Sequence, residues 1–205
     1  IFQDPQTSLN PLMTIGAQLL ETINTTKKLF GKEAREKAID LLQSVGIDQP
    51  EARMKAYPHQ FSGGMRQRVV IALALAGDPD LIIADEPTTA LDVSTQAQIL
   101  DLIKAICKKR KLGVIIITHD IGVISNIAHR VAVMFNGSVV ETGDVNQILS
   151  FPDHEYTKSL IAAVPSGKVK VERFTSIDYI EGGAQTQKRI DVKEHWLGER
   201  LVDTK

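Results

Sequence analysis

The chain has 205 residues, enough for one domain with a sizeable core, or for one domain with an appendage. Hydrophobic residues make up 43% and charged residues 24%, which excludes a disordered or collagen-like chain, and the net charge of −1 gives no reason to expect nucleic acid as a partner. The single cysteine, Cys107, excludes an intrachain disulfide framework, and no apolar run approaches the roughly 18 residues of a membrane-spanning helix.

Residues 4–57 carry the signals of helices and no strand pattern. Thr14 is a suitable N-cap for one helix and Gly46 a suitable end for a second, and each helix has apolar residues at helical spacing. We therefore expect residues 1–80 to form a helical subdomain.

From residue 81 the pattern changes to short, β-branched apolar runs at 81–84 and 114–117. Such runs are typical of strands buried on both faces of a parallel sheet, and the helical spacing between residues 99 and 106 predicts a helix that connects them. The strand–helix–strand order predicts an α/β subdomain over residues 81–165.

Beyond the second predicted strand the sequence gives one strong turn signal, followed by weaker signals toward the end of the chain. Asn136 and Gly137 predict a two-residue β-hairpin, and Asp144 followed by Gln147 resembles a capping box at the start of a short helix. Residues 166–205 are more polar and form a small C-terminal extension of uncertain structure, with strand-like alternation at 168–174 and a Gly-Gly turn at 182–183.

Two adjacent carboxylates follow the first predicted strand. Asp85 is well placed at a strand end to hold Mg²⁺, and Glu86 can point at a water that attacks a phosphate. A polar strand end that turns into a loop is an equally good reading of this pattern alone.

Ser62, Gly63 and Gly64 precede a helical run that begins at Met65. The serine is a good N-cap, the glycines let another group approach the backbone, and the free amides of a helix start attract anions. Ordinary helix capping explains these three residues more often than ligand binding does.

Two further polar residues are weak signals by themselves. His119 follows the strand at 114–117, so in a parallel sheet it would share an edge with Asp85 and Glu86 and could hydrogen-bond a phosphate. Gln3 precedes an Asp-Pro pair and can coordinate Mg²⁺ or orient a water. A lone histidine at a strand end is usually structural, and a lone surface glutamine indicates nothing.

The ordered combination is far more specific. Residues 61–68 (FSGGMRQR), 81–88 (LIIADEPT), 90–92 (ALD) and 118–120 (THD) resemble the signature, Walker B, D-loop and switch-histidine motifs of the ATP-binding-cassette ATPases, and Gln3 matches the Q-loop glutamine. The resemblance covers roughly residues 1–165. The longer matches at 58–68, 85–93 and 151–160 resemble the oligopeptide/dipeptide importer branch, in which Met often stands at position 65.

The resemblance implies a fold and a set of roles. The fold would be that of P-loop NTPases, with a helical subdomain and an incomplete parallel sheet. Mg²⁺ would be held by Asp85 and Gln3, the water oriented by Glu86 and Gln3, and the terminal phosphate of ATP contacted by His119. The remaining residues would bind the ATP of a facing domain or couple the two sites across the interface: Ser62, Gly63, Gly64, Met65, Gln67 and Asp92.

The Walker A loop of this family, Gly-x-x-x-x-Gly-Lys-Ser/Thr, does not occur in the 205 residues. Because the chain begins at Ile1 in mid-pattern and without an initiator methionine, we interpret it as an N-terminally truncated product. We expect it to have little ATPase activity alone, to form a composite site with a complete partner, and to expose apolar surface where the strand of the loop would lie.

The resemblance also implies partners and a place in the cell. They would be a second ATPase subunit, transmembrane permease subunits and, indirectly, a substrate-binding protein, at the cytoplasmic face of the cell membrane and without nucleic acid. Two alternatives remain open at this point. They are a soluble cassette ATPase that does not transport, and an interaction module that does not hydrolyse ATP.

Overall fold

The computed structural model describes residues 1–163, 173–179 and 185–191, and side chains up to residue 163. Two compact units are formed, Ile1–His119 and Asp120–Lys205. The expected subdomain boundaries at residues 80 and 165 remain predictions. In the described residues, no helix is long and apolar enough to cross a membrane.

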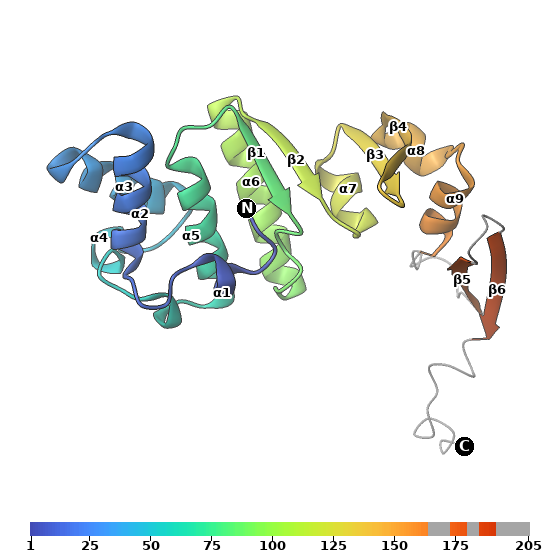
Figure 1. The fold of residues 1–205 in the computed structure, drawn as a ribbon, viewed down its shortest axis with the longest axis horizontal. Coiled ribbons are helices and arrows are strands. Elements are labelled where there is room, and N and C mark those ends of the chain that lie inside the picture. The colour runs from blue at the N-terminus through green and yellow to red at the C-terminus, as the bar shows by residue number, and fades with distance from the viewer. Residues whose placement is uncertain (164–172, 180–184, 192–205) are drawn as a thin grey trace, which may run out of the picture. The chain divides into compact units, whose positions relative to one another are not determined.

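Helices dominate the first part of the first unit (Figure 1). Thr14 caps the second of them by accepting a hydrogen bond from the amide of Ala17, and Gly46 follows the third at a φ of +75°, so both sequence signals are confirmed. The helical elements are α1 (Pro5–Ser8), α2 (Ile15–Lys27), α3 (Gly31–Ser44), α4 (Pro50–Arg53), a 3₁₀ turn η1 (Pro58–Gln60) and α5 (Gly63–Leu75).

The core of this helical part lies between α2, α3 and α5. Apolar residues at helical spacing on each of them are almost completely buried. The start of α2 packs closely on the loop before η1, because the amide of Gly16 donates to the Met54 carbonyl at 2.9 Å. The largest buried side chains are Ile15, Leu19, Ile23, Leu41, Leu42, Val45, Val69, Ile71 and Leu75.

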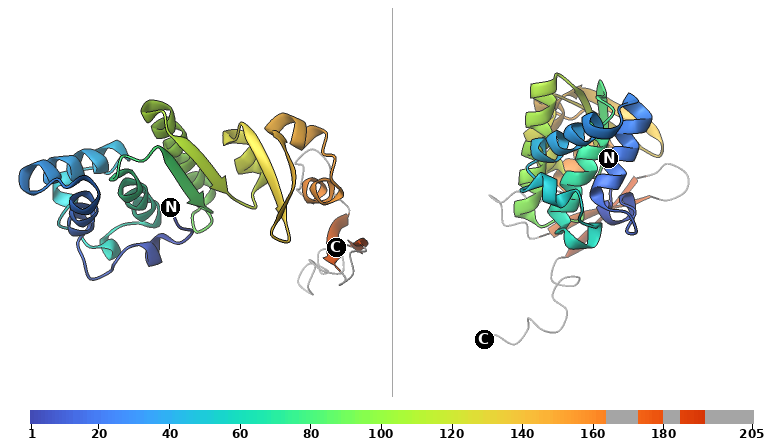
Figure 2. Two further views of the ribbon diagram at one scale, coloured as in Figure 1. Left: turned by 45° about the horizontal axis from the view of Figure 1, so that its top comes forward. Right: turned by 90° about the vertical axis from the view of Figure 1, so that its left-hand side faces the viewer.

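Two parallel strands, β1 (Leu81–Asp85) and β2 (Gly113–Ile117), are connected by α6 (Val93–Arg110), as the sequence predicts. Figures 1 and 2 show α6 running beside the two strands. The register pairs Asp85 with Ile117. Both strands therefore end at the same edge of the pair.

The prediction that these strands are buried on both faces is wrong for the described structure. Ile82 and Ala84 are buried, but Ile83 and Leu81 on the other face are 52% and 48% exposed, as are Ile115 and Ile117 of β2, at 49% and 51%. No described element of the first unit covers that face, so half of the apolar side chains of the two strands are exposed.

The second unit contains the predicted hairpin. Strands β3 (Arg130–Phe135) and β4 (Ser138–Asp144) are antiparallel, and Asn136 and Gly137 between them have φ values of +47° and +77°. Positive φ at both positions is the pattern of a type I′ turn, which Asn-Gly favours.

The other elements of this unit are α7 (Ile121–Ile127), α8 (Val145–Ser150), α9 (Glu155–Ala162), β5 (Arg173–Tyr179) and β6 (Gln185–Asp191). The expected helix after Asp144 is α8, which Asp144 caps by accepting from the amide of Asn146. The strand expected at 168–174 overlaps β5 from Arg173. Its first five residues, and the Gly-Gly turn at 182–183, lie outside the described residues.

Candidate functional site

Gln3, Glu86 and His119 meet at the carboxyl ends of β1 and β2. The start of the chain runs along the outer edge of β1: the Ile1 amino group donates to the Ile83 carbonyl at 2.8 Å, and the Asp85 amide donates to the Ile1 carbonyl at 2.9 Å. This is the bonding pattern of a parallel bridge. It delivers Gln3 to the strand end where Glu86 begins the next loop.

The Glu86 carboxylate is the centre of this cluster. Gln3 Nε2 donates to its Oε2 at 2.6 Å, the Thr89 hydroxyl donates to the same oxygen at 2.9 Å, and His119 Nδ1 lies 2.9 Å from its Oε1. These contacts favour the charged form. The hydrogen bond with His119, followed by that from Thr89, holds the pKa of Glu86 below its ordinary value.

The backbone of Glu86 is in an unusual conformation. Its φ is +43°, in the left-handed region that residues with a Cβ rarely adopt, and its amide donates to the Ile117 carbonyl at 2.8 Å. Such a conformation costs about 1–3 kcal/mol, and strained residues of this kind cluster at active sites and ligand clamps. The turn directs the carboxylate toward Gln3 and His119, which the sequence alone does not reveal.

Asp85 is the last residue of β1 and is exposed at the same edge. Within the described residues no group of three His, Cys, Asp or Glu side chains gathers as a metal site. Mg²⁺ does not require one, because it is commonly held by one or two protein oxygens together with phosphate oxygens and water. The carboxylate of Asp85 and the amide oxygen of Gln3 are hard donors of this kind, so these residues fit Mg²⁺ bound to a nucleotide.

A second set of predicted residues lines a groove at the start of α5. Ser62 caps this helix by accepting a hydrogen bond from the Met65 amide at 3.3 Å, and Ser62 and Gly63 are exposed to solvent. We call this feature the signature groove. It has a volume of about 300 Å³ and is lined by Ser62, Gly63, Gly64, Met65, Arg68, Ala90, Leu91, Asp92, Thr95 and Gln98.

Asp92 forms the opposite wall of the signature groove as the N-cap of α6. Its Oδ1 accepts from the Thr95 amide at 2.9 Å and its Oδ2 from the Thr95 hydroxyl at 2.7 Å. These two bonds, the amide first, hold the pKa of Asp92 below its ordinary value. Thr95 and Gln98 face the groove without a sequence motif that singles them out.

Gln67 does not line the groove, although the family resemblance implies a binding role. Its side chain is only 1% exposed, and neither its amide nitrogen nor its amide oxygen has a hydrogen-bond partner. On α5 it lies on the buried side, together with Val69 and Val70. The structure therefore gives Gln67 no access to a ligand in the groove.

Apart from Gln67, the predicted residues thus form two separate groups in the first unit. One segment joins the Glu86 cluster to the signature groove. It begins with Asp85 and Glu86 and ends with Asp92. Gln96 braces this segment, because its Nε2 donates to the carbonyls of Thr88 and Leu91 at 3.0 and 3.2 Å. Thr89 belongs to the first group and was not anticipated.

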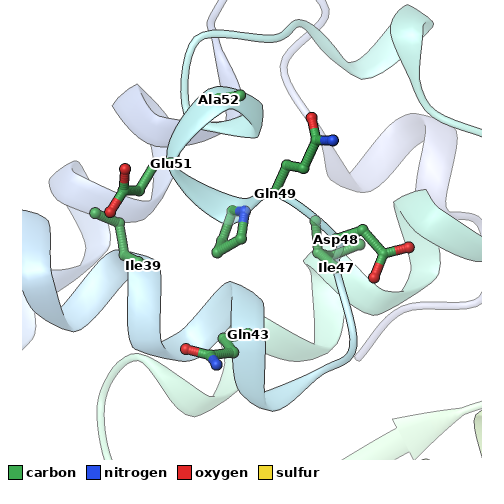
Figure 3. A pocket seen from close by; sticks show the side chains of 8 residues that line it. Ile39, Gln43, Ile47, Asp48, Gln49, Glu51 and Ala52 are labelled. Atoms are coloured by element: carbon green, nitrogen blue, oxygen red, sulfur yellow. The ribbon is translucent and has the colours of Figure 1, made fainter.

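A larger hollow, of about 570 Å³, lies at the surface where α3 approaches the start of α4. Figure 3 shows Ile39 and Gln43 on one side of it, and Asp48 and Glu51 among the residues around it. None of the residues predicted from the sequence lies there.

Comparison with known proteins places these features in context. A family model described as "ABC transporter" matches residues 1–89. The oligopeptide transport ATP-binding protein OppD of Bacillus subtilis (strain 168) is 55% identical over 166 residues, which are 81% of this chain and 46% of the relative. The dipeptide transport ATP-binding protein DppD of Escherichia coli (strain K12) is 48% identical over 183 residues, 89% of this chain and 56% of the relative. The chain spans about half the length of these relatives.

Solved structures show the same likeness. The ATP-binding cassette MJ0796, in a dimeric post-hydrolysis state bound to ADP and phosphate, aligns with a TM-score of 0.60 and 31% identity over 71% of this chain and 61% of that one. CbiO1 from Clostridium perfringens, part of an ABC transporter complex, aligns with a TM-score of 0.65 and 28% identity over 78% of this chain and 60% of that one. The predicted fold class is confirmed.

Proposed function

We propose that the chain belongs to the ATP-binding-cassette family of transporter ATPases and is part of the ATP-hydrolysing subunit of a peptide importer. One observation carries the proposal. Gln3 and His119, from distant parts of the chain, both lie within hydrogen-bonding distance of the Glu86 carboxylate. The likeness to oligopeptide and dipeptide transport proteins supports the peptide class of cargo.

In this proposal the Glu86 cluster serves a nucleotide on the chain's own side. Bound Mg²⁺ would supply charge neutralisation of the phosphates, held through the oxygens of Asp85 and Gln3. Glu86 orients and accepts a proton from the attacking water, because it is ionised and sits beside the strand end. His119 Nδ1, at 2.9 Å from Glu86 Oε1, keeps the carboxylate directed at the same point, and the other ring nitrogen donates to the terminal phosphate when both ring nitrogens carry a proton.

The signature groove serves a nucleotide that a facing subunit holds. Ser62 is exposed at the positive end of α5, a helix of 13 residues, and its hydroxyl and the amides of Gly63 and Gly64 are the anion-binding groups that phosphate requires. Met65 lines the groove beside them, and Asp92 couples its two walls. The dimeric state of the similar cassette supports a facing subunit of the same family.

The wider assembly follows from the same proposal. The partners are a second ATPase subunit and transmembrane permease subunits, with a substrate-binding protein acting through the permease. The subunit is bound peripherally at the cytoplasmic face of the membrane, where closure and release of the two ATPase subunits drive uptake of the peptide.

A complementation assay tests the proposal. The 205-residue chain is mixed with a complete relative, such as the Bacillus subtilis oligopeptide protein, that has an intact phosphate loop but a disabled signature segment. We expect neither protein to hydrolyse ATP alone, and the mixture to do so through the partner's loop and this chain's groove.

Robust hydrolysis by the chain alone would refute the assignment of roles, because it contains no Gly-x-x-x-x-Gly-Lys-Ser/Thr loop. A mixture that associates without any turnover would favour the interaction module. Co-purification of the associated pair with permease subunits separates the importer from a soluble cassette ATPase.

A further inference from the structure

Thr95 contacts both walls of the signature groove. Its hydroxyl donates to Asp92 Oδ2 at 2.7 Å, on the α6 side. Its γ-methyl group faces Gly64 on the α5 side, so closely that a Cβ built on Gly64 would lie 2.6 Å from Thr95 Cγ2. Beyond the two chain neighbours of Gly64 and the backbone of α5, the three heavy atoms nearest to this built Cβ all belong to Thr95.

The two contacts are mechanically linked through one rotatable bond. Thr95 is β-branched, so a single χ1 angle places its hydroxyl and its methyl group together. The hydrogen bond to Asp92 fixes that angle, and the amide of Thr95 holds the other carboxylate oxygen at 2.9 Å. The methyl group therefore cannot turn away from Gly64 unless the bond to Asp92 breaks.

We propose that Thr95 is a positioning residue that couples Asp92 to the Ser62–Gly64 turn and sets the width of the signature groove. When Asp92 moves, the methyl group moves with it and shifts the backbone at Gly64, where the free amides of α5 lie. The same contact dictates that residue 64 lacks a side chain, independently of how closely a phosphate approaches. This inference rests on the proposed function for its consequence in ATP hydrolysis, but its geometry concerns this chain alone.

The neighbouring glycine shows how specific the contact is. A Cβ built on Gly63 would lie 3.5 Å from Leu91 Cδ2, an ordinary van der Waals distance. Gly63→Ala is therefore the matched control for Gly64→Ala in measurements of folding. The alanine at position 63 should be accommodated, whereas the alanine at position 64 should collide with Thr95.

The test is a double-mutant cycle on the 205-residue chain, followed by urea unfolding. We expect Gly64→Ala to destabilise the chain and Gly63→Ala to change it little. Thr95→Ser removes the methyl group and keeps the hydroxyl, so Gly64→Ala should be tolerated in the Thr95→Ser background. We expect a coupling of about tenfold in the unfolding equilibrium, as for other residues in direct contact. Additive effects of the two changes would overturn the proposal.

A second measurement separates positioning from packing. The pKa of Asp92 is followed by NMR titration in Thr95→Val, which keeps the shape but loses the hydroxyl, and in Thr95→Ser. We expect the pKa to rise toward its ordinary value in Thr95→Val and to stay low in Thr95→Ser, while the amides of Gly63 to Met65 exchange faster in Thr95→Val. An unchanged Asp92 titration, or unchanged amide exchange, in Thr95→Val would overturn the coupling.

The complementation assay then tests the consequence for catalysis. Gly64→Ala should lower turnover, and Thr95→Ser should restore it in the double variant. If the mixture hydrolyses ATP but the double variant remains as inactive as Gly64→Ala, ligand approach alone dictates Gly64 and that part of the proposal fails. If the unmodified mixture is inactive, the proposed function fails, whereas the unfolding cycle and the titration still decide the role of Thr95.

Discussion

Asp78 joins three helices of the first unit through its carboxylate. It accepts from Lys37 of α3 at 3.0 Å and lies 3.3 Å from both Lys27 of α2 and Arg110 of α6. Its own φ is +44°, a left-handed conformation that Asp and Asn tolerate better than other residues with a Cβ. Asp78→Asn therefore removes the charge without adding backbone strain.

The size of the stability loss expected for Asp78→Asn follows from the solvent exposure of the four side chains. The Asp78 side chain is 40% exposed and its partners 29–32%, so each pair is screened by water and contributes at most about 1 kcal/mol. Three pairs that share one carboxylate are not additive, and we expect Asp78→Asn to cost about 1–2 kcal/mol of unfolding free energy. The cost should shrink in roughly 1 M salt, because the Debye length there is only about 3 Å.

The contribution of Asp78 to stability depends on pH in a definite direction. Partial burial raises the pKa of Asp78, but hydrogen bonds from Lys37 and Lys27 outweigh it, so the net pKa lies below the ordinary value. The stabilisation is then fully present above the unfolded pKa of about 3.9, and it is lost as the pH falls through the lower folded pKa.

Urea unfolding at low and high salt measures this. Glu36→Gln is the matched control, since it breaks the single exposed pair with Lys32 at 3.7 Å and should cost close to nothing. The reasoning is refuted if Asp78→Asn costs no more than Glu36→Gln, or if its cost is the same in high salt.

Three further predictions concern packing, capping and the exposed face. Gly16→Ala should destabilise the chain by about 1–3 kcal/mol in urea unfolding, because the new Cβ would lie 2.5 Å from the backbone oxygen of Met54, and a neutral effect would contradict the close approach. Glu141 accepts from the amide of Asp153 at 2.8 Å, which lowers its pKa, so its stabilisation is present above about pH 4.3 and is lost on acidification. Glu141→Gln should therefore weaken the fall of the melting temperature at acid pH. An unchanged dependence of the melting temperature on pH would disprove the role of the bond between Asp153 and Glu141. Ile83→Thr should leave stability nearly unchanged and reduce the fluorescence of a bound hydrophobic dye, because Ile83 is 52% exposed; a large loss of stability would mean that this face is covered.

Much of the first unit is readable from the sequence because local signals and packing agree there. Thr14, the apolar spacing of α2 and α3, and Gly46 each specify the same helices that the structure has. The parallel pairing of β1 and β2 follows from their apolar runs, and it brings Asp85 and Glu86 to the same edge as His119.

What the sequence could not supply depends on contacts between distant residues. The left-handed turn at Glu86, the hydroxyl of Thr89 on its carboxylate and the methyl group of Thr95 against Gly64 leave no local pattern. Gln67 shows the opposite failure. A motif assigns it to a ligand, whereas its place on the inner side of α5 buries it.

The central claim is that Ser62 of this chain acts on a nucleotide held by another subunit. The most direct measurement is the turnover of the mixed complex with Ser62→Ala, compared with Asp144→Ala, which removes the N-cap of α8 in the second unit. We expect Ser62→Ala to lower turnover by about tenfold or more, as for the loss of a preorganised donor, and Asp144→Ala to leave it unchanged. Equal turnover in the two variants at saturating ATP would contradict the claim.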